Sequence, residues 1–147
     1  LAHELGHFKH KHIIKRIVAM FALSLAGFAL LGYLAGQVWF YAGLGVQPNL
    51  ASSNDALALL LFMLALPVFS FFIAPLFAQV SRKHEFEADA YAVRQTSASD
   101  LSTALLKLYE DNASTLTPDP LYVSFYYSHP GASERLERMR GMASTAA

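Results

Sequence analysis

Two long apolar segments occupy the middle of the chain. They run from about residue 17 to 46 and from about residue 56 to 80, and no Lys or Arg occurs between Arg16 and Arg82. About 20 apolar residues suffice for a helix to cross the hydrocarbon layer. A soluble helix would carry a polar stripe, and these segments carry almost none. The pattern predicts two transmembrane helices; two buried helices of a large soluble core are the less favoured alternative.

The connector at residues 47–55 contains turn-forming residues, and its one charged residue is Asp55. Positive residues flank the outer ends of the two spans, among them Arg16 and Arg82. The positive-inside rule therefore places both outer ends in the cytoplasm and the connector on the other side. Such a hairpin returns the chain to the face that it left, so residues before the first span can meet residues after the second.

Residues 81–147 show soluble, helical patterns. A charged helix is expected to continue from residue 81 to about 95, and Asp100 is the expected N-cap of the next helix. A last helix is expected at about residues 132–142. The expected fold class is therefore all-α: an integral membrane protein with two transmembrane helices and a helical C-terminal segment.

Composition narrows the chemistry of this chain. The formal net charge is zero, which gives no electrostatic case for nucleic-acid binding. The absence of cysteine excludes disulfides and thiolate metal sites, so any metal must be held by nitrogen and oxygen ligands. Charged residues make up 15% of the chain, against about 25% in soluble domains. Because the sequence starts at Leu1 without an initiating methionine, we expect a fragment of a longer protein.

An H-E-x-x-H motif lies within residues 1–16, formed by His3, Glu4 and His7. Residues i and i+4 share one face of a helix, so both imidazoles can bind one zinc ion. Glu4 lies beside them and can act as the general base toward a water that zinc activates. Residues 1–16 are thus a predicted active-site helix. The alternative is a solvated, basic helix start whose histidines bind nothing.

A third zinc ligand is expected after the second span. Catalytic zinc takes three protein ligands and keeps one position open. Glu85 is the first acidic residue after that span, and the hairpin brings it back toward His3 and His7. Asp89, one turn later, could accept a hydrogen bond from a zinc-bound histidine. Glu87 is a rival ligand that points the other way, and a solvated acidic face is the alternative to any metal role.

The other histidines differ in their expected roles. His10 could be a substitute ligand, although a contact with the surface or lipid headgroups is favoured, and His12 and His84 are interpreted as interfacial. His129 lies in an aromatic loop and is followed by Arg135. These two side chains could donate hydrogen bonds to a developing oxyanion or a substrate carboxylate. The alternative is a loop histidine packed against tyrosines.

Three stretches together resemble the type I CAAX prenyl endopeptidases, which are integral-membrane zinc peptidases. They are residues 2–9, residues 85–92, and residues 127–130 with the Glu-Arg-Leu sequence at 134–136. The resemblance implies a ring of seven transmembrane helices around a water-filled chamber, closed by a helical gluzincin-type zinc-peptidase domain. This chain would supply the last two spans and most of that domain.

The resemblance also implies roles for single residues. The zinc ligands would be His3, His7 and Glu85, with one Zn²⁺ per chain. The remaining assignments are Glu4 as catalytic base, Asp89 as supporting carboxylate, and His129 and Arg135 as groups that contact the substrate and transition state.

The expected function is a membrane-embedded zinc metalloendopeptidase of the CAAX prenyl protease type. Its partners would be a peptide or protein substrate, prenylated or membrane-associated, and the lipid bilayer. The alanine-rich sequence favours a bacterial inner membrane over an endoplasmic reticulum membrane, with the active site on the cytoplasmic side. The alternatives are an HtpX-like quality-control metallopeptidase and a truncated membrane protein without catalytic activity.

Overall fold

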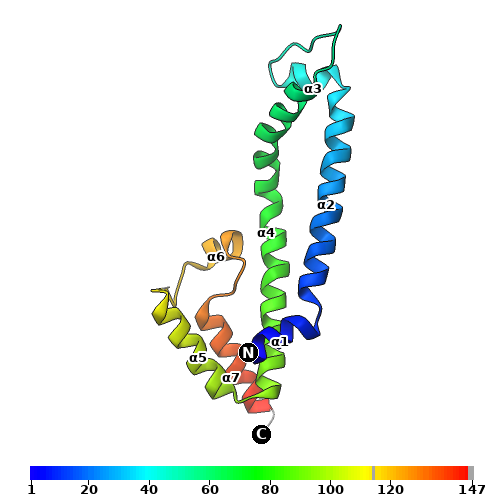
Figure 1. The fold of residues 1–147 in the computed structure, drawn as a ribbon. Helices are drawn as coiled ribbons and strands as arrows, with labels where there is room; N and C mark the ends of the chain where they lie inside the picture. The colour runs from blue at the N-terminus through cyan, green and yellow to red at the C-terminus, as the bar shows by residue number, and fades with distance from the viewer. Residues whose placement is uncertain (114, 146–147) are drawn as a thin grey trace. The chain divides into compact units, whose positions relative to one another are not determined.

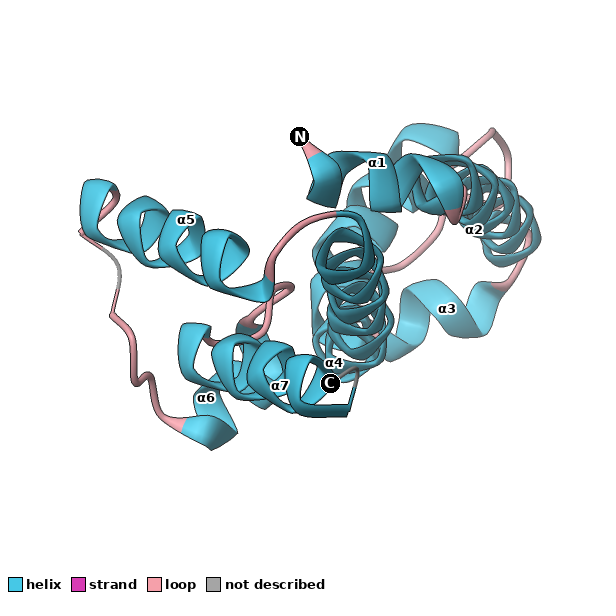
Figure 2. Cartoon of the chain, turned by 90° about the horizontal axis from the view of Figure 1, so that it is seen from below, coloured by secondary structure: helices cyan, strands magenta, loops and turns pink. Residues whose placement is uncertain are grey.

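The computed structural model describes residues 1–113 and 115–145, with side chains described through residue 142. These described residues form helices joined by loops, with no strand among them, as Figure 2 shows. This confirms the expected all-α class. The helices in chain order are α1 (Ala2–Lys9), α2 (His12–Ala35), α3 (Val38–Gly43), α4 (Asp55–Gln95), α5 (Ala98–Asp111), α6 (Pro120–Tyr126) and α7 (Ala132–Thr145).

The chain divides into two compact units. The first, here called the polar unit, consists of Leu1–Ile14 and Ile73–Ala147; the second, the apolar unit, is Lys15–Phe72. Helices α2 and α4 contribute to both units. The polar unit contains all six histidines of the sequence, and therefore all the histidine chemistry considered above.

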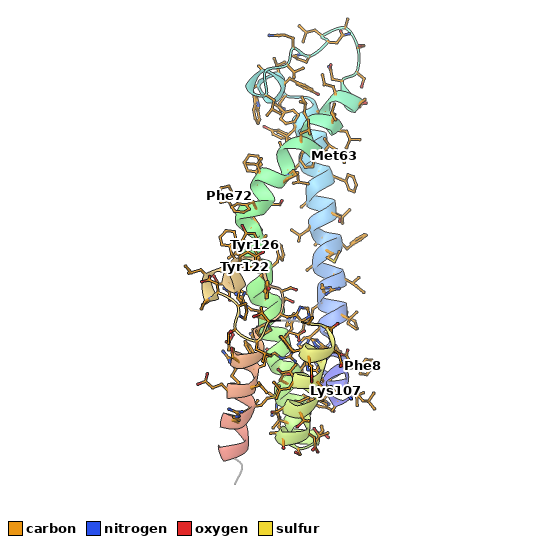
Figure 3. The ribbon with its side chains drawn as sticks, turned by 90° about the vertical axis from the view of Figure 1, so that its left-hand side faces the viewer. Phe8, Met63, Phe72, Lys107, Tyr122 and Tyr126 are labelled. Atoms are coloured by element: carbon orange, nitrogen blue, oxygen red, sulfur yellow. The ribbon has the colours of Figure 1, made fainter. Side chains whose placement is uncertain are left out.

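The apolar unit exposes most of its large apolar side chains. Among the described residues, α2 and α4 are long and apolar enough to cross a membrane. Phe72 is 69% exposed and projects outward from α4 (Figure 3). Side chains along α2, such as Phe21 and Phe28, are similarly exposed. Exposed apolar surface on this scale is unusual for a protein in water.

The first apolar segment forms a long helix and a short one, separated by a turn. Helix α2 ends at Ala35, short of the expected residue 46, and Gln37 is extended before α3 begins. The Tyr41 hydroxyl donates a 2.8 Å hydrogen bond to the Ala35 carbonyl, which satisfies a group that the helix end leaves free. A small apolar core stabilises this turn, formed by Phe40, Tyr41, Ala58 and Leu61.

In the polar unit, helix α1 approaches α4 very closely at Gly6. A Cβ atom at this position would lie 2.8 Å from the Ala88 Cα atom and 2.9 Å from its carbonyl oxygen. Real Cβ atoms do not come so close to backbone, so only glycine permits this contact. Because Gly6 lies between His3 and His7, the same contact brings the H-E-x-x-H helix against the acidic part of α4.

Helices α5 and α7 complete the polar unit. They lie side by side in Figures 1 and 2, with Leu105 and Met139 buried. The expected N-cap at Asp100 is wrong: the cap of α5 is Ser97, whose side chain accepts a hydrogen bond from the Asp100 backbone N–H. Asp100 instead lies in the first turn, where a carboxylate favours the positive helix end.

Candidate metal centre

Helices α1 and α4 bring His3, His7 and Glu85 together. The Nε2 atoms of the two histidines are 3.2 Å apart. Glu85 Oε2 lies 3.4 Å from His3 Nε2, and Glu85 Oε1 lies 3.4 Å from His7 Nε2. A tetrahedral zinc with ligand bonds of about 2.0–2.2 Å requires ligand atoms roughly 3.3–3.5 Å apart. This set of two imidazoles and one carboxylate therefore fits zinc in spacing and in chemistry.

The buried ion pair between Asp89 and Arg135 contacts His3 on the side away from His7 and Glu85. His3 Nδ1 lies 2.9 Å from Asp89 Oδ1, and Asp89 is 2% exposed. Arg135 donates to both oxygens of the same carboxylate, from Nε to Oδ2 at 2.8 Å and from Nη2 to Oδ1 at 2.7 Å. With Nδ1 directed at Asp89, His3 turns its Nε2 atom toward His7 and Glu85, and this nitrogen can bind a metal once it has lost its proton.

The electrostatics keep both carboxylates ionised. Burial alone would raise the pKa of Glu85, but the hydrogen bond with His3 and the charges of His129 and Arg135 lower it below the usual value. Burial likewise opposes ionisation of Asp89, and its bonds with His3 and Arg135 again lower the pKa. Asp89 and Glu85 are thus ready to pair with a cation at neutral pH.

The pKa values of the two histidines of the motif are shifted in opposite directions. The hydrogen bond with Asp89, followed by that with Glu85, raises the pKa of His3 to about 9, although burial opposes this. Burial lowers the pKa of His7. In the metal-free protein a proton on His3 therefore occupies part of the space between the ligands, and a metal must displace it.

Glu4 follows His3 on α1, and its side chain is exposed. It is close enough to His7 to act on the charge of that imidazole. The Glu4 carboxylate is thus open to solvent on the helix that carries His3 and His7. The role of Glu4 as general base stays a prediction.

His129 and Arg135 both approach Glu85, but they differ in exposure. His129 Nε2 lies 3.6 Å from Glu85 Oε1, and 64% of its side chain is exposed. Its Nδ1 atom is 3.0 Å from Ser128 Oγ. Arg135 Nη1 lies 3.6 Å from Glu85 Oε2, but only 9% of its side chain is exposed. The His129 side chain is thus open to solvent, whereas the Arg135 guanidinium is buried against the carboxylates of Asp89 and Glu85.

Arg82 has a role that sequence reasoning missed. We expected a positive residue flanking the second span, but the guanidinium is buried and donates to backbone carbonyls of Val123, Ser124 and Tyr127. These carbonyls belong to α6 and the residue after it, where Figure 3 shows the neighbouring rings of Tyr122 and Tyr126. Arg82 therefore connects the segment before His129 to helix α4 through hydrogen bonds. Nothing in the sequence distinguishes such an arginine from a flanking one.

His12 is the second residue that the sequence did not reveal. The sequence predicts an interfacial histidine, but the His12 side chain is buried. Its Nδ1 atom lies 3.0 Å from His7 Nδ1, and its Nε2 atom lies 2.9 Å from Glu87 Oε2. Burial alone would raise the pKa of Glu87, yet its bond with His12 and the charges of His12, Lys83 and His84 lower it. Glu87 follows Glu85 by two residues, which places the two carboxylates on roughly opposite sides of α4, and Glu87 has His12 as its own partner.

These features are typical of a helical zinc metallopeptidase. The sequence profile of Peptidase family M48 matches residues 1–143, and the chain belongs to this family. This confirms the resemblance drawn from the three stretches of sequence.

Known relatives agree with this membership. The chain is 35% identical to CAAX prenyl protease 1 homolog of Arabidopsis thaliana, over 96% of this chain and 32% of the relative. It is 34% identical to CAAX prenyl protease 1 homolog of Homo sapiens, over 97% of this chain and 30% of the relative. The crystal structure of S. mikatae Ste24p matches with a TM-score of 0.80 and 30% identity, over 95% of this chain and 35% of that one. The chain thus spans about a third of the length of these relatives.

Proposed function

We propose that the protein containing this chain is a membrane-embedded zinc metalloendopeptidase of the CAAX prenyl protease type. One observation carries the proposal: the Nε2 atoms of His3 and His7 and the carboxylate of Glu85 converge to 3.2–3.4 Å in a chain of Peptidase family M48. Two imidazoles and a carboxylate form a common donor set for catalytic zinc. We assign one zinc ion to these three side chains.

We assign a separate role in peptide hydrolysis to each residue around the ligands. Zinc, when bound, polarises the scissile carbonyl and lowers the pKa of water. Glu4 takes the proton of the attacking water on its carboxylate and delivers it to the leaving amine. The exposed His129 donates a hydrogen bond to the oxygen on which negative charge develops. Asp89 and Arg135 hold His3 and Glu85 in place, because their own donors and acceptors are directed at those groups.

The family and the apolar helices support the substrate class that we propose. We place α2 and the apolar part of α4 in a membrane, because both are long and apolar enough to cross one, with the metal centre on the cytoplasmic side. The names of the relatives favour a prenylated C-terminal peptide. The alanine-rich sequence favours a bacterial inner membrane, where a membrane-associated peptide would take its place because bacteria generally lack protein prenylation.

The test is Glu4→Gln in the full-length protein. Loss of the general base should lower kcat/KM for a farnesylated peptide by about 10³-fold, while the zinc content stays at one per chain. The matched control, Glu137→Gln at an exposed position of α7, should retain full activity. Undiminished cleavage by the Glu4 variant would refute the assignment. Cleavage of an unfolded membrane protein in preference to the farnesylated peptide would instead indicate a quality-control peptidase.

A further inference from the structure

We propose that Glu87 and His12 form a hydrogen-bonded relay that fixes the tautomer of His7 and keeps the His7 Nε2 lone pair directed at the zinc. Both would be positioning residues. The inference deepens the proposed function, and it rests on zinc binding by His3, His7 and Glu85. It concerns side chains that lie behind the ligand set and that the proposed reaction does not otherwise use.

The contact between two ring nitrogens carries the argument. His12 Nδ1 lies 3.0 Å from His7 Nδ1, and only one proton can lie between them, so one nitrogen donates and the other accepts. His12 Nε2 lies 2.9 Å from Glu87 Oε2, and an ionised carboxylate only accepts. His12 therefore carries its proton on Nε2 and donates it to Glu87.

The remaining proton positions follow. A metal on His7 Nε2 requires the proton of that ring to be on Nδ1, where it is donated to His12 Nδ1, while His12 donates from Nε2 to Glu87. His7 then has a lone pair on Nε2, the atom that lies 3.4 Å from Glu85 Oε1 and 3.2 Å from His3 Nε2. The opposite direction of donation would place a proton on His7 Nε2, and a protonated nitrogen cannot bind a metal.

The two histidines of the motif thus have different supports. His3 contacts the buried carboxylate of Asp89 directly, and Arg135 holds that carboxylate. His7 reaches its carboxylate through one extra imidazole, because Glu87 faces away from Glu85 on α4. The shared result is an Nδ1 proton directed away from the metal on both rings.

A break in the helix makes the longer route possible. In an uninterrupted helix, residues five apart lie about 140° from each other around the axis. Here α1 ends at Lys9 and α2 starts at His12, and Lys11 between them has a left-handed φ of 56°. This turn redirects the chain so that the His12 ring faces His7. The His84 ring stacks on His12 with centroids 4.0 Å apart and planes 12° apart, which fixes the plane of the bridging ring.

An alternative use of the same side chains is a second cation site. Ligand atoms of His10, His12 and Glu87 lie within 4.8 Å of one another. A cation on His12 Nε2 would move the proton of that ring to Nδ1, and His7 would then receive the tautomer that cannot bind the catalytic zinc. The observed 2.9 Å contact between His12 and Glu87 is a hydrogen-bond distance, shorter than the spacing of two ligands on one zinc. The relay therefore predicts one zinc per chain.

Two pairs of variants in the full-length protein test the relay. Glu87→Lys replaces the acceptor with a donor, which reverses both protons, and zinc affinity should fall at least 100-fold. Glu87→Gln retains an acceptor oxygen, and its zinc affinity should stay within about threefold of wild type. His12→Leu removes the acceptor for His7 and should weaken zinc 10- to 100-fold, as outer contacts to zinc ligands typically do. His12→Asn restores an acceptor near the Nδ1 position and should recover most of the loss.

The zinc dissociation constant is measured by competition with a chelator, and the fold of each variant by circular dichroism. Nitrogen-15 NMR of the His7 ring in metal-free wild-type protein reads the tautomer directly, and we expect Nδ1–H. An Nε2–H tautomer, equal affinities for His12→Leu and wild type, or two tightly bound zinc ions per chain would overturn the relay. Because the tautomer is measured without metal, the relay can be judged even if zinc binding, and with it the proposed function, fails.

Discussion

The polar unit buries polar and charged side chains, whereas the apolar unit exposes large apolar ones. Among the described side chains, every buried polar or charged one belongs to the polar unit: His12, Arg82, Glu85, Asp89 and Arg135. The buried side chains of the apolar unit are aliphatic or aromatic, and large apolar side chains such as Leu23 and Phe72 are exposed. The difference shows that one chain is built for two surroundings: the polar unit excludes water from paired charges, whereas the apolar unit exposes a surface suited to lipid or to other apolar helices.

The polar unit can bury charge because each charge has a partner. Asp89 contacts His3 and Arg135, and Arg135 in turn lies near Glu85. Removing one member of a buried pair leaves the other without compensation, which costs more than the pair itself contributes. We therefore expect the polar unit to lose stability when a buried charge is removed, and the apolar unit to be disturbed when a charge is introduced.

The largest expected effect is that of Asp89→Ala. The substitution leaves the Arg135 guanidinium buried and unpaired, and the free energy of unfolding of the zinc-free protein should fall by about 3–5 kcal/mol. The control is Asp100→Ala on α5, where the carboxylate is exposed, and a change within about 0.5 kcal/mol is expected. Urea unfolding in detergent measures both. Equal, small losses would show that the buried pair does not stabilise the polar unit.

The next largest effect tests the surroundings of the apolar unit. Leu23 lies near the middle of α2 and is 51% exposed. If α2 crosses a membrane, Leu23→Asp should cost about 3 kcal/mol of insertion free energy, because a carboxylate is poorly tolerated at the bilayer centre. Leu23→Ile is the matched apolar control. A membrane-insertion assay of the full-length protein measures the integrated fraction, and normal integration of the Asp variant would contradict a transmembrane α2.

Gly6→Ala should produce a smaller loss in the polar unit. The added methyl group meets the Ala88 backbone at 2.8 Å, so α1 must move and carry His3 and His7 with it. We expect a destabilisation of about 1–3 kcal/mol and weaker zinc binding. Gly32→Ala is the control, because nothing lies within 4 Å of a Cβ there and alanine favours a helix. Zinc affinity unchanged by Gly6→Ala would show that the close contact does not position the ligands.

A change of pH tests the polar unit without any substitution, through the raised pKa of His3. Because the pKa of His3 is raised to about 9, zinc must displace a proton from it below that pH. Apparent zinc affinity should therefore rise about tenfold per pH unit between pH 7 and 9 and level off above. Chelator competition at constant ionic strength measures this, and an affinity already constant from pH 7 upward would be the contrary result.

The stability of the metal-free protein should change in the opposite direction. The folded-state pKa of His3 exceeds the unfolded value of about 6.5, so protonated His3 contributes stability that is fully present below pH 6.5. That contribution is lost as the pH rises toward 9. Unfolding experiments at pH 6.5 and 9.5 therefore complement the zinc titration, and a protein more stable at pH 9.5 would contradict the raised pKa.

The sequence predicted the features that depend on periodicity and chain direction. The two apolar segments and the helical patterns gave the all-α class, and the three matching stretches gave the family. The hairpin argument singled out Glu85 as the partner of His3 and His7, and the structure brings these three side chains together. Their binding of zinc stays a prediction until a metal is measured.

The features that the sequence could not reveal depend on single backbone conformations. Lys11 has a positive φ, a conformation that few non-glycine residues adopt and that the sequence does not signal. The position of the His12 ring depends on the turn at this residue. The N-cap at Ser97 was missed because both Ser97 and Asp100 are residue types that cap helices. The burial of Arg82 depends on carbonyls from α6, about forty residues later in the chain.

The contacts of Arg82 link the segment before His129 to helix α4. Arg82 and Glu85 lie less than one turn apart on α4, so the same rod bears a metal ligand and the anchor of the segment leading to His129. Movement of α4 would carry that ligand and that anchor together and leave their spacing unchanged. Helix α1 is held to the same α4 by the close approach of Gly6 and by the contacts of His3 and His7 with its carboxylates. One helix therefore sets the positions of all three candidate ligands and of the segment before His129.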